Sequence, residues 1–253
     1  MVRRRLKPWV VITFFIMCLI GIIYSSYRIL TWKSHVEENE KIQDVIDEKI
    51  VIIRPSTENG ELESEELEYN IDFDSLKEKN PDTVAYIKVN NTNIDYVVVK
   101  GKDNSYYLNH NFDKKWNVAG WIFGDYHNKF DDTDKNLVIY GHSIKSGSMF
   151  GTLRKVLNKD WYENEDNHLI VLITESGMHY YEVFSTYSII AEDYYINTSF
   201  QNNNEFDGFI KKLKSRSIYN YGIEVNGEDR ILTLSSCIGD GKKRVVLHAK
   251  LVD

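Results

Sequence analysis

Residues 230–237 read RILTLSSC and residues 243–251 read KRVVLHAKL, and these two segments decide the fold. Their apolar residues alternate with polar ones, and the GDG at 239–241 supplies turn residues, so the pattern predicts two strands joined by a turn. A period of two places Leu232 and Leu234 on one face of the first strand, and Ser235 and Cys237 on the other. The same period puts Arg244 on the outer face of the second strand. If the strands are neighbours, a thiol and a guanidinium meet at one end of a sheet.

That arrangement suits nucleophilic catalysis. A nearby positive charge favours the thiolate form of a cysteine, and a guanidinium can also stabilise an oxyanion. The competing interpretation is that Cys237 is a small buried core residue, which is a common fate of a free cysteine. These two segments alone leave both interpretations open.

The N-terminus predicts a membrane anchor. Residues 1–8 are basic, and an apolar run over 9–24 continues to residue 32 with Arg28 as its only charge. We therefore expect a transmembrane signal-anchor helix over 9–32, with a cytoplasmic N-terminus and an extracellular remainder. A cleaved signal peptide is the alternative, but no small-x-small cleavage site closes the apolar run.

Charge and cysteine content narrow the function further. Residues 34–253 carry 25 basic and 38 acidic side chains, a net charge of −13, which disfavours nucleic acid as a partner. The chain has two cysteines, and Cys18 lies in the apolar run, so Cys237 has no partner for a disulfide outside the membrane. The lack of paired cysteines argues against structural zinc, and the acidic residues lack EF-hand spacing. We predict neither a required metal nor a cofactor.

The rest of the chain is predominantly strand-like. We expect a juxtamembrane helix over 33–53, an acidic linker reaching residue 69, and one catalytic domain over 70–253 with short helices at 72–79 and 205–216. Aromatic and β-branched residues dominate eight segments, which predicts a closed all-β barrel. The eight expected strands cover 84–89, 94–99, 120–123, 137–140, 168–174, 178–190, 231–236 and 244–252.

Of the seven histidines, His142 is the best candidate for a general base. It follows the apolar segment 137–141 and opens a serine-rich loop, and rigid scaffolds often present catalytic groups where a strand ends in a loop. His248 is expected on the same strand face as Arg244, as a supporting residue. The other five histidines are interpreted as structural or surface residues.

These residues carry a resemblance to a known family. The segments YGHS at 140–143, TLSSC at 233–237 and RVVLH at 244–248 resemble the histidine, cysteine and arginine motifs of sortases, the cysteine transpeptidases of Gram-positive cell surfaces. Five further segments resemble the class B branch, and together the motifs follow the family order over residues 70–253. They are NIDY at 93–96, GKDN at 101–104, YYLNH at 106–110, IFGDY at 122–126 and GSMFG at 147–151.

The resemblance implies a mainly β fold: an eight-stranded sortase β-barrel with N-terminal helices and a helix before the cysteine strand. It implies Cys237 as nucleophile, His142 as general acid/base and Arg244 as the oxyanion or substrate-positioning group. Ser235 could help to hold substrate or Arg244. The motif departs from the family in having Ser236 where threonine is commoner, and the loop before Arg244 is short.

The activity so implied is cleavage of a threonine-containing sorting signal through a thioester, and transfer of the surface protein to a peptidoglycan amine. A Pro-x-Thr-like signal is expected. The alternatives are a pilin-polymerising sortase, a hydrolytic cysteine protease, and an anchored binding module with an inert cysteine. Faster turnover on adding an amine would distinguish a transpeptidase from a protease, and ready alkylation of Cys237 that is slowed by altering His142 would count against the binding module.

Overall fold

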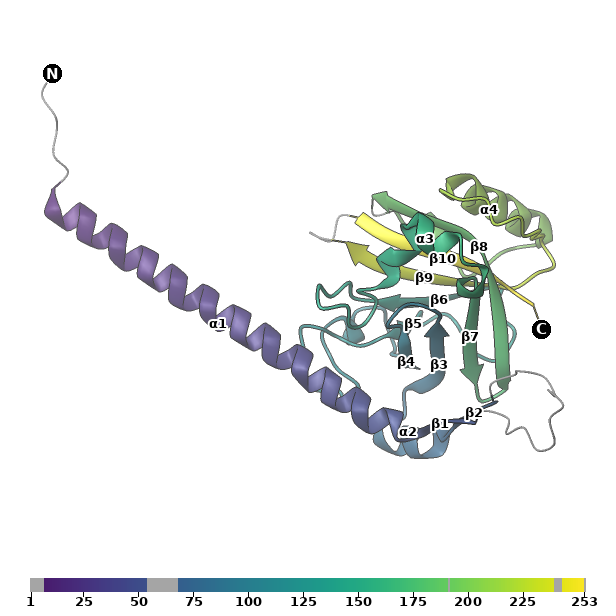
Figure 1. The fold of residues 1–253 in the computed structure, drawn as a ribbon, viewed down its shortest axis with the longest axis horizontal. Helices are drawn as coiled ribbons and strands as arrows, with labels where there is room; N and C mark the ends of the chain where they lie inside the picture. The colour runs from purple at the N-terminus through teal and green to yellow at the C-terminus, as the bar shows by residue number, and fades with distance from the viewer. Residues whose placement is uncertain (1–6, 54–67, 191, 239–242, 253) are drawn as a thin grey trace, which may run out of the picture.

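The computed structural model describes residues 7–53, 68–190, 192–238 and 243–252 (Figure 1). The expected acidic linker lies mainly at 54–67 and the expected turn at 239–242, both outside these residues. Before the barrel come α1 Pro8–Asp47, β1 Ile50–Ile53, β2 Glu68–Ile71 and α2 Phe73–Lys79. The barrel strands are β3 Thr83–Val89, β4 Asp95–Val99, β5 Phe123–Gly124, β6 Asn136–Gly141, β7 Leu169–Thr174, β8 Gly177–Ile190, β9 Ile231–Ile238 and β10 Lys243–Leu251. Between them lie η1 Tyr106–Leu108, η2 Leu153–Leu157, α3 Lys159–Tyr162, η3 Glu165–Asn167, η4 Tyr194–Ile196 and α4 Asn203–Arg216.

Eight strands close into a barrel in the order β10-β8-β7-β3-β4-β5-β6-β9. The β4–β5 and β6–β9 pairs are parallel, and the other pairs are antiparallel. Among the described residues of the barrel, closure pairs each strand with a neighbour on both sides, which avoids the open edges at which sheets aggregate. The predicted eight-stranded barrel is therefore confirmed, although β5 is only two residues long.

The middle of β10, residues 245–249, is buried on both faces. Val245, Leu247 and Ala249 pack in the main barrel core. Val246, on the other face, packs in a second core with the apolar stripe of α4, and Figure 1 shows that helix outside the barrel beside β8. The α4 residues in this core are Phe206, Ile210 and Leu213.

The N-terminal segment forms one continuous helix rather than two. The apolar part of α1 projects away from the barrel and is fully exposed, whereas its last turns bury Val36, Asn39, Ile42 and Ile46 (Figure 1). The expected helix over 33–53 is wrong in its last residues, because β1 at Ile50–Ile53 pairs with β2. All four residues of β1 are β-branched, and such side chains favour strands over helices.

Candidate active site

Three strands bring the predicted catalytic positions together. β6 pairs in parallel with β9 as far as Gly141 opposite Ser236, so His142 leaves β6 beside the end of β9. On the other side of β9, Cys237 pairs with Arg244 of β10. The backbone of Cys237 therefore lies between the strands that carry the histidine and the arginine.

His142 is held in one orientation by the last residue of η1. Its Nε2 lies 2.8 Å from the backbone oxygen of Leu108. Because a carbonyl oxygen can only accept, Nε2 must carry the hydrogen, which assigns the Nδ1 nitrogen to any proton exchange with substrate. The backbone oxygen of His142 accepts from the amide of Phe150 at 3.0 Å, so the following loop is also tied down.

A cavity of about 220 Å³ opens beside these residues. This is smaller than the ~300–1,000 Å³ of typical small-molecule sites, so it suits part of a peptide rather than a whole pentapeptide. Most of its wall is apolar or aromatic, and Arg244 and two carboxylates supply the charge. The lining residues are Asn104, Leu108, Phe123, Tyr140, Gly141, His142, Glu192, Asp193, Tyr195, Ile196, Ser235 and Arg244.

Ser235 lines this cavity, and its side chain is almost fully buried. Its hydroxyl oxygen lies 2.9 Å from the hydroxyl of Tyr195, a residue of η4 that also lines the cavity. The hydrogen bond joins the cysteine strand to the opposite wall. The sequence did not predict this contact between Ser235 and Tyr195.

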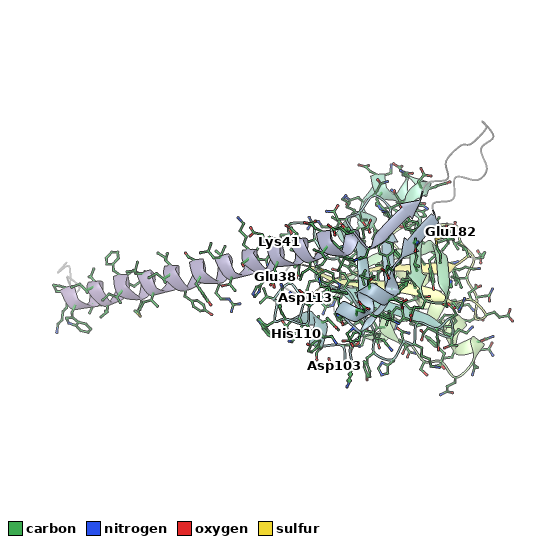
Figure 2. The ribbon with its side chains drawn as sticks, turned by 90° about the horizontal axis from the view of Figure 1, so that it is seen from below. Glu38, Lys41, Asp103, His110, Asp113 and Glu182 are labelled. Carbon is green, nitrogen blue, oxygen red and sulfur yellow. The ribbon has the colours of Figure 1, made fainter. Side chains whose placement is uncertain are left out.

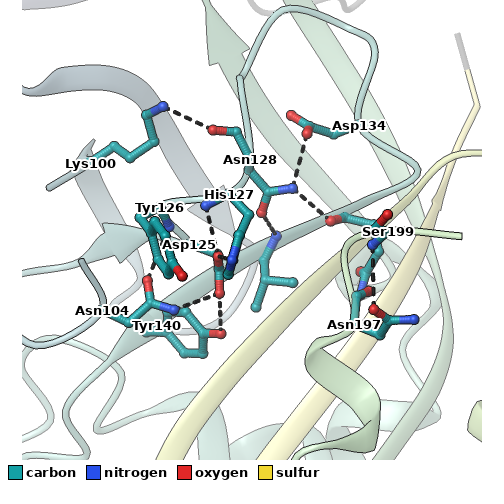
Figure 3. Close-up of polar contacts among 12 residues, drawn as sticks. Lys100, Asn104, Asp125, Tyr126, His127, Asn128, Asp134, Tyr140, Asn197 and Ser199 are labelled. Atoms are coloured by element: carbon teal, nitrogen blue, oxygen red, sulfur yellow. Dashed lines mark hydrogen bonds and ion pairs between the residues drawn. The ribbon is translucent and has the colours of Figure 1, made fainter. Parts of the chain in front are cut away.

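A buried carboxylate organises a second part of the wall (Figure 3). Asp125 accepts from the side-chain amide of Asn104 and from the hydroxyl of Tyr140, both at 2.7 Å. It also accepts from the amide of His127 at 2.9 Å, and its Oδ1 lies 2.8 Å from Nδ1 of that ring. Burial, and then the adjacent charge of Asp125, raise the pKa of Tyr140, so this hydroxyl stays protonated as a donor. Asp125 thus fixes two residues that line the cavity.

His248 lies in the second core behind the cysteine strand rather than in the cavity. Thr233 donates to Asn136, so its hydroxyl oxygen accepts from Nδ1 of His248 at 2.9 Å. Nε2 then accepts from the hydroxyl of Tyr187, also at 2.9 Å, and Tyr187 accepts from Tyr194. Complete burial lowers the pKa of His248 to about 3, which keeps the ring neutral. His248 therefore belongs to a buried hydrogen-bond network, and its supporting role in catalysis stays a prediction.

That network reaches the cavity through the backbone. The side-chain amide of Asn136 donates to the backbone oxygen of Asn197 at 2.9 Å and to that of Tyr195 at 3.3 Å. The segment containing η4 is therefore anchored to β6, β9 and β10 at once.

Comparison with known proteins identifies this architecture. A family model described as a sortase domain matches residues 87–252. The chain belongs to the sortase family. It is 38% identical to the sortase B of Listeria monocytogenes over 232 residues, which covers 87% of this chain and 90% of that protein. The resemblance to class B sortases is thereby confirmed.

Solved structures of sortases also match the fold of this chain. The structure of Clostridium perfringens sortase B matches with a TM-score of 0.67 and 38% identity, covering 72% of this chain and all of that one. The sortase B from B. anthracis in complex with AAEK1 matches with a TM-score of 0.73 and 31% identity, covering 87% and 99%. This class B sortase is a cysteine transpeptidase that acts on surface proteins. The expectation of a non-catalytic binding module is set aside.

Several residues of the site were not singled out from the sequence. Asn104, Asp125 and Tyr140 lie in segments that carry the family resemblance, and that was the available signal. Tyr195 and Asp193 lie in the connection between β8 and α4, where no motif marks them. They reach the cavity only because that connection folds back over the end of β6.

Proposed function

We propose that Cys237 is the nucleophile of this sortase, His142 its general acid/base and Arg244 its oxyanion-stabilising group. The observation that carries the proposal is the strand register, which pairs Cys237 with Arg244 and Ser236 with Gly141. His142 and Arg244 also line one cavity. A nucleophile, a base and a fixed cation within one site are the minimum that acyl transfer through a thioester needs.

In the first step the thiolate of Cys237 attacks the carbonyl carbon of a threonine in the sorting signal. The carbonyl oxygen gains negative charge, which the guanidinium of Arg244 stabilises. The carbon–nitrogen bond then breaks as Nδ1 of the His142 imidazolium donates a proton to the departing amine, since an amide nitrogen leaves poorly without one. The products are a thioester and a free peptide amine.

In the second step a peptidoglycan amine attacks the thioester carbon. Neutral His142 accepts a proton from that amine through Nδ1, and the carbon–sulfur bond breaks to return the Cys237 thiolate. The hydrogen bond from Nε2 to Leu108 holds the ring in the same tautomer through both steps. A new amide joins the surface protein to the wall.

The apolar cavity wall supports a Pro-x-Thr-like signal. Leu108, Phe123 and Ile196 offer an apolar surface for a proline ring, and Ser235 and Arg244 line the same cavity. The basic N-terminus and the apolar part of α1 support a membrane anchor with a cytoplasmic N-terminus and an extracellular barrel. Anchoring would keep the enzyme on the face where its substrates are presented.

The test uses a fragment of residues 34–253 and quenched pentapeptides of the Pro-x-Thr type, with and without a wall-peptide amine. We expect cleavage after threonine, a new amide when the amine is present, and no turnover by Cys237→Ala. His142→Gln should lose ~10²–10⁴-fold in kcat, the usual contribution of general acid–base catalysis. Ile218→Ala, an exposed substitution after α4, is the matched control and should retain full activity.

Measuring how fast the trapped thioester forms separates the role of Arg244 in acylation from a role in peptide binding. Arg244→Lys keeps the charge but loses the planar fork, so it should slow acylation more than it weakens peptide binding. Turnover by Cys237→Ala would refute the nucleophile assignment. Cleavage that added amine never diverts to an amide would indicate a hydrolase instead.

A further inference from the structure

The loop over residues 109–119 is bound directly to helix α1. The side-chain amide of Asn117 donates to the backbone oxygen of His35 and to the side-chain oxygen of Asn39, both at 2.9 Å. The amide of Val118 donates to Nδ1 of His35 at 3.2 Å, and Asn39 donates to the backbone oxygen of Gly120 at 2.8 Å. We call residues 109–119 the helix-contact loop. Its height along α1 is set by His35.

That height is close to the expected membrane surface. Trp9 and Trp32 are 23 residues apart in one helix, ~35 Å along its axis. This span exceeds the ~30 Å hydrocarbon core and places both rings in the headgroup layers, where tryptophan is favoured. His35 follows Trp32 by three residues, ~4.5 Å further along the axis. The helix-contact loop therefore meets the outer headgroup layer.

The loop presents side chains that suit this position. Trp116 is 61% exposed, although a tryptophan in a folded domain is usually well buried. The adjacent Lys115 side chain is 66% exposed, and Asp113 is held back in ion pairs with Lys79 and Lys115. In an exterior segment of net charge −13, an exposed aromatic beside a lysine is a surface that a phospholipid headgroup layer can accept.

The loop is rigid enough to act as a support. His110 pairs with Trp116 in an isolated β-bridge, and its ring contacts Trp116 edge-on at 5.7 Å. The other side of the His110 ring stacks on Tyr106 at 3.9 Å. Figure 2 shows His110 and Asp113 on the edge of the domain that lies beside α1, near Glu38 and Lys41.

The same chain segment leads to the catalytic histidine. Leu108, which accepts the hydrogen bond from His142, immediately precedes the helix-contact loop. We propose that this loop rests on the outer surface of the phospholipid bilayer, with Trp116 in the headgroup layer and Lys115 against lipid phosphates. The contact fixes the height and orientation of the active site above the membrane. This inference rests on the membrane anchor of the proposed function.

The test places the full chain in liposomes of phosphatidylcholine and phosphatidylglycerol, with bromine atoms near the headgroup end of the acyl chains. In a Trp9→Phe/Trp32→Phe background the remaining tryptophans are Trp116, Trp121 and Trp161. The last two are 0% and 4% exposed, so bromolipid quenching should report on Trp116. We expect a loss of emission that disappears when Trp116→Phe is added.

A parallel sample separates this proposal from the anchor itself. With Trp9 and Trp32 restored and Trp116→Phe in place, quenching reports on α1 alone. If α1 is quenched while Trp116 is not, the anchor stands and the surface contact is refuted. If neither is quenched, both fail. Full quenching of Trp116 by aqueous iodide in the liposomes would also refute the contact and leave this face for a protein partner.

A functional readout follows from the geometry. Trp116→Ala should reduce transfer to an acceptor amine carried on a lipid in the same liposomes, while cleavage of a soluble peptide stays unchanged. Ile218→Ala, which truncates an exposed apolar side chain beyond α4, is the control and should change neither rate. Equal loss of both rates, or loss of neither, would contradict the proposed role of the contact.

Discussion

Replacing His248 by glutamine should remove a pH-dependent loss of stability that the buried ring imposes below neutral pH. In the folded chain complete burial lowers the pKa of His248 from 6.5 to about 3. The unfolded chain therefore binds a proton in this range that the folded chain excludes. Stability is fully present above pH 6.5 and falls as the pH drops towards 3.

The magnitude follows from the width of that window. Each pH unit between the two pKa values changes the free energy of unfolding by ~1.4 kcal/mol, so lowering the pH from 6.5 to 4.5 costs about 3 kcal/mol. For a domain of this size that corresponds to a shift of roughly 6–12 °C in Tm. Glutamine retains a hydrogen-bonding amide near Tyr187 and Thr233 but cannot bind the proton.

The assay is urea unfolding of residues 34–253, followed by tryptophan fluorescence at pH 7.5, 6.5, 5.5 and 4.5. His248→Gln should be less stable than the wild type at pH 7.5, because the packing and hydrogen bonds around the ring are changed. By pH 4.5 this difference in the free energy of unfolding should have changed by about 3 kcal/mol in favour of the variant, so that it narrows or reverses.

The wild type and the variant carry the same carboxylates, so the titration of these groups cancels in the difference between the two free energies of unfolding. The reasoning would be refuted if the difference in free energy of unfolding between the wild type and His248→Gln stayed constant from pH 7.5 to 4.5. It would mean that the folded chain accommodates the protonated ring, and that the network through Thr233 and Tyr187 does not hold it neutral.

Further variants test the walls of the site. Asp125→Asn should lower stability by about 1–3 kcal/mol and reduce kcat/KM, because an amide cannot accept from every donor around this position; thermal unfolding and peptide kinetics check this. Tyr195→Phe removes the bond to Ser235 and should cost about 1 kcal/mol, with an increase in KM; an unchanged KM would argue against a role for this wall. Gly141→Ala should nearly abolish activity and lower Tm, because its Cβ would lie 2.5 Å from Ile122 and 2.7 Å from Phe150, directly before His142; a variant with wild-type kinetics would contradict this.

The sequence was enough to predict the barrel strands and the catalytic candidates. Aromatic and β-branched residues indicated the barrel strands, although the strand expected over 120–123 overlaps β5 only at Phe123. Family motifs selected Cys237, His142 and Arg244, and the register of β6, β9 and β10 brings these positions together. Local patterns sufficed here because each motif sits at the end of a strand whose position is set by its own residues.

The helix that ends at Asp47 shows where local patterns failed. The apolar residues over 33–53 keep a roughly helical spacing, and the run of β-branched residues at Ile50–Ile53 was the sequence signal for a boundary that this spacing concealed. The structure ends the helix there because β1 finds a partner in β2, which comes later in the chain. A pairing between distant segments leaves little trace in either segment alone.

The sequence by itself determined the strand pattern, the acidic exterior, the apolar N-terminal run and the residue types of the chemistry. Only the tertiary structure decided that Asp125 organises the cavity wall, that Tyr195 bonds Ser235, and that His248 is buried and neutral. It also decided that α1 holds the helix-contact loop at His35. The physical reason is that hydrogen-bond partners and burial depend on which distant segments meet, and that is settled only when the barrel closes.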